Sequence, residues 1–117
     1  MSASTAMAVE FDLVKANEYL RKVETALGQT KLDYDKSKEM YSQLEKYNYQ
    51  AEKCTQDEIK KLAGISSLEQ DTGLMQDTEE NAADVQYIEK KKKAHSGRLS
   101  QCRLYVFKSQ DKIYDLQ

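Results

Sequence analysis

The sequence predicts an all-α protein, a long antiparallel two-helix hairpin with coiled-coil-like packing. Composition is the first observation, because a chain with Pro 0, Gly 4, 32% charged residues and 39% hydrophobic residues is typical of long helices. The second observation is that apolar residues recur with heptad spacing in both halves of the chain. With 117 residues, the chain is expected to form a single helical-hairpin domain, 1–117.

The first helix is expected to run from about residue 8 to about residue 62. Two stripes with heptad spacing support it: Leu13, Leu20, Leu27, Tyr34 and Tyr41, and Val9, Ala16, Val23, Thr30, Ser37, Leu44 and Ala51. Gly28 falls between the stripes, where glycine costs about 1 kcal/mol relative to alanine. One glycine in that position is not expected to end the helix.

A turn is expected at about 63–67, with Leu62 and Gly64 at its start. Two consecutive lysines precede Leu62 and complement the negative end of a helix dipole, and glycine is the usual helix terminator. Ser66 and Glu69 then have the spacing of a capping box, which favours the start of another helix.

The second helix is expected at about 68–115, with a short extra helix or a kink near 66–80, where Gly73 interrupts the pattern. Its acidic residues come first and Lys90–Lys93 begin a more basic part, the order that suits the helix dipole. Two heptad stripes support this helix: Val85, Lys92, Leu99, Val106 and Ile113, and Ile88, His95, Cys102, Ser109 and Leu116.

Reversal of the chain at Gly64 would place Leu13 beside Leu116 and Leu27 beside Cys102. In that register Cys54 lies roughly 40 Å along the rod from Cys102, which excludes an intramolecular disulfide. Two cysteines are also too few for a disulfide framework and have no metal-ligand spacing.

Several large apolar residues lie off the two-helix interface and have no second helix to cover them. Tyr19, Tyr47 and Met40 are therefore expected to be partner-binding residues, since tyrosine buries area in interfaces while keeping a wet hydroxyl. A homo-dimer or hetero-dimer in the form of a four-helix bundle would cover them. The alternative is that a short helix near 66–80 folds over them.

No enzyme, cofactor or metal site is expected. His95, the one histidine, has no second histidine or cysteine pair near it, so it is interpreted as a histidine at the edge of the helix interface. The run Lys90–Lys93 could hold phosphate or lipid. Four consecutive lysines point all round a helix axis, however, which favours a solvated collar.

Charge and hydropathy exclude further classes. The formal net charge of −2 gives no basic excess, so no nucleic acid partner is expected. No apolar run approaches a bilayer span, so no membrane span is expected. The N-terminal stretch MSASTAMAVEF lacks the pattern of a cleavable signal peptide. The expected location is cytoplasmic, with secretion that needs no cleavable signal peptide as the alternative.

Two short stretches carry a resemblance to a known family: Leu62-Ala63-Gly64 at the expected tip, and Phe107-Lys108-Ser109-Gln110-Asp111 late in the second helix. Together with the hairpin they resemble the Trp-x-Gly small secreted proteins of type VII secretion and the related partners of Leu-x-Gly toxins. The tip glycine matches that pattern and the tryptophan is absent. Members that act as targeting partners for large toxins can lack the tryptophan, so the departure favours that type.

The resemblance implies a non-catalytic protein–protein interaction module, a targeting partner or chaperone for a larger helical or toxin protein. Phe107 and Asp111 are one turn apart on one helix face, so they would present an aromatic anchor and a charge together to a receptor. The alternative for this pair is ordinary packing, with Phe107 against the first helix near Lys22. The alternative function is a coiled-coil scaffold subunit of a cytosolic complex, or a clamp like the chaperones of type III secretion.

Overall fold

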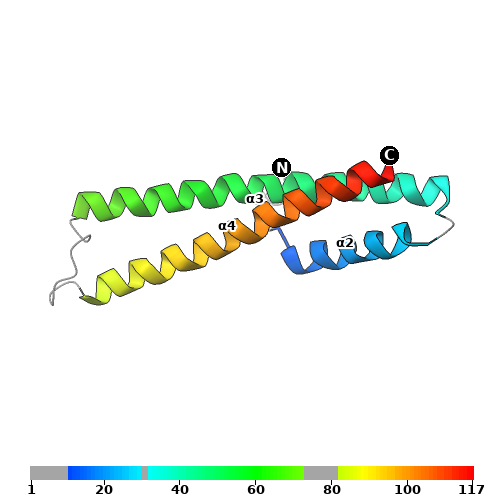
Figure 1. Ribbon diagram of the computed structural model, residues 1–117. Coiled ribbons are helices and arrows are strands. Elements are labelled where there is room, and N and C mark those ends of the chain that lie inside the picture. The colour runs from blue at the N-terminus through cyan, green and yellow to red at the C-terminus, as the bar shows by residue number, and fades with distance from the viewer. Residues whose placement is uncertain (1–10, 30–31, 73–81) are drawn as a thin grey trace, which may run out of the picture.

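The chain folds into helices that pack along one another. The computed structural model describes residues 11–29, 32–72 and 82–117, and the regular structure within these ranges is entirely helical. The helices are α2 (Leu13–Leu27), α3 (Tyr34–Thr72) and α4 (Ala82–Leu116). The predicted all-α class is confirmed. A long antiparallel pair, α3 and α4, dominates the molecule, and α2 lies along one half of it (Figure 1).

Local sequence explains where α2 begins and which face it buries. The Asp12 side chain caps the helix, because its Oδ1 accepts a hydrogen bond of 3.1 Å from the backbone N–H of Lys15. The buried residues of α2 follow helical spacing and form one apolar face: Ala16, Leu20, Val23 and Ala26. This face turns α2 towards the groove between α3 and α4.

The predicted continuous helix from about 8 to about 62 is wrong, because the chain reverses after Leu27. Gly28 caps α2 and donates its N–H to carbonyl oxygens of the last turn. Asp33 then caps α3, and its Oδ1 accepts a hydrogen bond of 2.7 Å from the N–H of Lys36. Both helices keep an apolar face on either side of the break, so heptad spacing alone does not reveal the reversal.

The predicted turn at 63–67 is also wrong. Leu62 and Gly64 lie inside α3, which continues to Thr72, and α4 begins at Ala82 instead of near residue 68. A helical glycine costs only about 1 kcal/mol, and the packing of α3 along α4 outweighs that cost.

The expected kink or short helix near 66–80 is not found in the part of this stretch that the structure describes. Residues 66–72 belong to the continuous helix α3. Gly73 and the rest of the stretch lie outside the described residues.

Pairing between α3 and α4 differs from the predicted register. Cys54 and Cys102 form a disulfide across the two helices, with Cα atoms 6.2 Å apart. Nearby, Asn48 Nδ2 donates a hydrogen bond of 2.7 Å to Ser109 Oγ. The prediction that Leu27 lies beside Cys102 is therefore wrong. The prediction that excluded an intramolecular disulfide is also wrong. The error follows from the late reversal of the chain, which shifts every partner along the rod.

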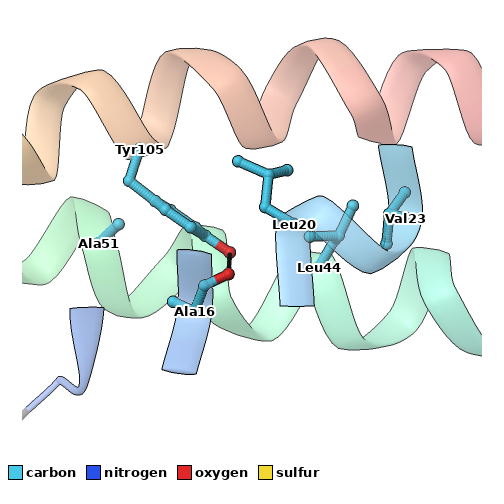
Figure 2. Packing of buried hydrophobic residues seen from close by; sticks show 6 residues of the cluster. All are labelled: Ala16, Leu20, Val23, Leu44, Ala51 and Tyr105. Atoms are coloured by element: carbon cyan, nitrogen blue, oxygen red, sulfur yellow. Dashed lines mark hydrogen bonds between the residues drawn. The ribbon is translucent and has the colours of Figure 1, made fainter. Parts of the chain in front are cut away.

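The core forms where α2 fills the groove between α3 and α4. Figure 2 shows the cluster of buried side chains that the three described helices contribute: Ala16, Leu20, Val23, Leu44, Ala51 and Tyr105. Tyr19, Tyr47 and Met40 are partly buried against this cluster. A helix of the same chain, α2, therefore covers residues that lie off the α3–α4 interface (Figure 1).

Candidate functional site

The outer face of α4 carries an exposed apolar stripe. Phe107 is 73% exposed, whereas its neighbour Val106 packs against the core. Asp111 is exposed one turn further along the helix. Leu104 and Tyr114, 52% and 75% exposed, continue the stripe at helical spacing. The exposure of Phe107 excludes the alternative in which this ring packs against the N-terminal helix.

The other predicted partner-binding residues do not lie on this exposed face of α4 and pack against the core instead. The rings of Tyr19 and Tyr47 are 5.7 Å apart between α2 and α3. Burial raises the pKa of the Tyr19 hydroxyl above its ordinary value, with smaller contributions from the charges of Glu39 and Tyr47. Met40 packs against the same cluster. The fold thus separates these residues from Phe107 and Asp111, which remain on an open face.

A buried carboxylate lies where the three-helix part of the molecule ends. The Glu58 side chain is 2% exposed and its oxygens lie 2.8 Å from His95 Nδ1, 3.5 Å from Arg98 Nε and 3.9 Å from Lys61 Nζ. Arg98 also donates a hydrogen bond of 3.1 Å to the carbonyl oxygen of Phe11. The cluster therefore ties α3 to α4 and, through Arg98, to the residue just before α2.

This cluster gives His95 a close carboxylate partner, and among the described residues it brings no nucleophile or second histidine to the ring. The predicted position of His95 at an interface edge agrees with its 23% side-chain exposure. Glu58 was missed, although it falls one heptad after Ala51 and so continues the stripe of the first half. A charged residue inside an apolar stripe is the signal that could have found it.

The lysines of the run 90–93 point in different directions, as expected for consecutive helical residues. Lys92 Nζ lies 3.2 Å from Glu69 Oε1 and 3.7 Å from Glu89 Oε1. The hydrogen bond and charge of Glu69, followed by the charge of Glu89, raise the Lys92 pKa above its ordinary value. Lys91 Nζ lies 5.5 Å from the centroid of the Tyr87 ring. These contacts give two of the lysines separate local partners.

Two open grooves follow the helices. One, of about 820 Å³, lies between the start of α2 and α4. The other, of about 350 Å³, lies between α3 and α4 at the far end of the pair, beyond the reach of α2. The second is lined largely by apolar side chains, which include Ile65, Leu68, Tyr87 and Ile88.

The described residues form neither a metal site nor a membrane span. Across residues 11–29, 32–72 and 82–117, no cluster of three or more His, Cys, Asp or Glu side chains is placed to hold a metal ion. None of the described helices combines the length and apolarity that crossing a membrane requires. No family model matches the chain, and no curated protein or solved structure is significantly similar to it. A function for this chain is therefore inferred from the positions and exposure of its described residues.

Proposed function

We propose that the protein is a non-catalytic recognition module that binds a larger helical protein and directs it, as a targeting partner or chaperone, into a secretion route of the type VII kind. The observation that supports this proposal most directly is the exposure of Phe107, whose neighbour Val106 packs against the core. A large aromatic ring that does not serve folding, with a charge one turn away, is typical of a binding hot spot.

Helix geometry supports reading Phe107 and Asp111 as one recognition unit. Residues four apart on a helix lie on one face with Cβ atoms about 5–6 Å apart. Lys112 Nζ lies 3.8 Å from Asp111 Oδ2, and the Asp111 side chain is 65% exposed. A surface pair of this kind contributes little to stability, so the carboxylate keeps its capacity to bind a partner's cation.

The disulfide between Cys54 and Cys102 favours a place in export over a cytosolic scaffold. Disulfides form and persist in oxidising compartments and are rare in the cytosol. The tip motif of the resemblance gives no support, because Gly64 lies inside α3. The proposal therefore depends on the late motif and on the disulfide.

The test is to make Phe107→Ala and Asp111→Ala separately and to measure both unfolding and the export of a larger candidate partner protein that is co-expressed with each variant. Phe107→Ala should change the free energy of unfolding by less than about 0.5 kcal/mol, since the ring is exposed. It should weaken partner binding by about 2 kcal/mol and reduce export.

The matched control is Tyr49→Ala, which removes a ring that is 63% exposed on α3. Export should be normal in this variant. If both α4 variants export normally, the stripe is ordinary surface, and if Phe107→Ala melts far below the wild type, Phe107 serves packing; either result excludes a recognition face. The alternative of a coiled-coil scaffold subunit or a clamp like the type III secretion chaperones then takes precedence.

A further inference from the structure

The far end of the α3–α4 pair forms a two-helix arm with an apolar groove that no described helix fills. We define the arm as residues 61–72 of α3 and 82–95 of α4 (Figure 1). Its groove has a volume of about 350 Å³. Tyr87 and Leu68 on its walls are 61% and 50% exposed. Large apolar side chains that remain this exposed on a small protein indicate an interaction surface.

The arm groove faces the same side of the α3–α4 pair as the groove that α2 fills. Ile65 lies three heptads after Leu44, which belongs to the core cluster with α2. Lys91 lies two heptads before Tyr105, whose hydroxyl bonds to Ala16 of α2. Residues separated by whole heptads keep the same face in a coiled-coil pair. The chain itself therefore shows how a third helix occupies this groove, and α2 starts beyond the arm, where the residue before it, Phe11, meets Arg98 (Figure 1).

Gly64 leaves space in the arm groove, because it has no side chain. It lies inside α3 and lines the groove, and a Cβ added there would meet nothing within 4 Å. Glycine lowers helix stability relative to alanine, and no packing among the described residues explains its presence here. Small residues allow a second helix to approach closely, as in interfaces between helices. This favours a helix as the occupant.

The charge of the residues that line the groove indicates which kind of helix would bind there. The groove lining includes Lys61, Lys91 and His95 and no carboxylate. Glu58, which contacts Lys61 and His95, is shared with Arg98, so the cluster keeps a positive excess. A second copy of the arm would bring like charges together, which disfavours self-association at this surface.

We propose that the arm binds one amphipathic helix of a partner protein, with acidic residues flanking its apolar stripe, in line with α2. The apolar stripe fills the space over Gly64 between Ile65 and Tyr87, and the acidic residues meet Lys61 and Lys91. This surface is separate from the outer face of α4, so the inference does not depend on the function proposed for Phe107.

The test uses the full chain with its disulfide intact and two synthetic amphipathic peptides of 15 residues, the length of α2. Both carry the same leucine stripe, flanked by glutamate in one and by lysine in the other, and each is labelled for fluorescence anisotropy. The glutamate peptide should bind at least about tenfold more tightly than the lysine peptide, and added salt should weaken it.

Gly64→Leu is the decisive variant, because its Cβ would meet no described atom within 4 Å and its larger side chain would occupy part of the groove. This variant should weaken binding of the glutamate peptide by about tenfold or more and should not lower the melting temperature of the protein. Gly97→Leu is the matched control, since Gly97 is also helical with nothing within 4 Å of an added Cβ and does not line the groove. It should leave binding unchanged.

Charge reversal supplies a second, independent readout. Lys91→Glu should shift preference from the glutamate peptide to the lysine peptide, whereas Lys90→Glu, on an exposed neighbour outside the groove lining, should not. Equal binding of both peptides, or binding that survives Gly64→Leu, would overturn the proposal. So would a dimer in sedimentation that Gly64→Leu abolishes, which identifies a second copy as the occupant. A lower melting temperature for Gly64→Leu would equally overturn it, because the groove is then filled by the chain itself.

Discussion

The hydroxyl of Tyr105 in α4 donates a hydrogen bond of 3.0 Å to the carbonyl oxygen of Ala16 in α2, and both residues are buried. Its ring also contacts Phe11 edge-on at 5.8 Å and Tyr47 at 6.4 Å between centroids. One side chain thus joins α4 to α2 and α3. The docking of α2, which covers the aromatic residues of the bundle, depends on it.

Tyr105→Phe should destabilise the protein by about 1 kcal/mol, the usual net contribution of a buried hydrogen bond. The ring contacts remain, so the fold should be unchanged by circular dichroism. Urea unfolding of the wild type and the variant gives the difference. Tyr114→Phe is the control, because Tyr114 is 75% exposed and should show no change. Equal effects from the two variants would mean that the bond to Ala16 carries no stability.

Alkaline pH should destabilise the protein through the same hydroxyl. Burial, with smaller contributions from Tyr47 and Tyr19, raises the pKa of Tyr105 well above its ordinary value of 10.0. The unfolded chain then loses this proton at lower pH than the folded protein. The contribution of Tyr105 to stability is therefore complete below about pH 10 and is lost as the pH rises above that value.

The measurement is the free energy of unfolding as a function of pH from about 8 to 11, which for one proton falls by up to about 1.4 kcal/mol per pH unit above the unfolded pKa. Tyr105→Phe should have a shallower slope than the wild type. Some slope should remain in the variant, because the pKa of Tyr19 is also raised. Parallel curves for the two proteins would contradict this account.

The disulfide should be a main source of stability for the long helix pair. Cys102 is fully buried and Cys54 is 7% exposed, and the bond closes a sequence separation of 48 residues. Replacement of both residues by alanine should lower the free energy of unfolding by about 2–4 kcal/mol. A reductant should bring the wild type close to the double variant and should leave the double variant unchanged. Labelling of two free thiols in the unreduced protein would refute the pairing.

The helical content of the chain could be predicted because it depends on local features. Apolar residues at heptad spacing mark the buried faces of the helices, and the short caps formed by Asp12 and Asp33 satisfy the first amide groups of α2 and α3. The place where the chain reverses depends on competition between such caps and long-range packing. Gly28 has partners for its amide and ends a helix, whereas Gly64 is carried through by the packing of α3 on α4.

The candidate site could be predicted only in part for the same reason. The position of Phe107 and Asp111 on one exposed helix face could be predicted because their relation is local to one helix turn. The disulfide between Cys54 and Cys102 depends on the register of two helices, and an error in one reversal moves every partner. Tyr19 and Tyr47 were expected to face a partner because no third helix was foreseen.

Among the acidic side chains that form ion pairs, Glu58 is the one whose substitution should lower the free energy of unfolding most. Its carboxylate is 2% exposed and lies against His95, Arg98 and Lys61, so its loss removes the counter-charge of the cluster. Glu58→Gln keeps the shape and one hydrogen-bonding oxygen. It should cost about 2 kcal/mol, less than the 3–5 kcal/mol typical of a broken buried pair, because Arg98 and His95 are 31% and 23% exposed and can turn to water.

Glu69→Gln provides the matched comparison for Glu58→Gln. Glu69 also bridges α3 to α4, through Lys92 at 3.2 Å, but the lysine side chain is 36% exposed. A pair that reaches solvent contributes at most about 1 kcal/mol, and salt weakens it. Unfolding of both variants at low and high salt separates the two cases. The Glu58 variant should remain the less stable one at high salt, because burial shields its contacts from ions; equal stabilities would show that the cluster behaves as ordinary surface charge.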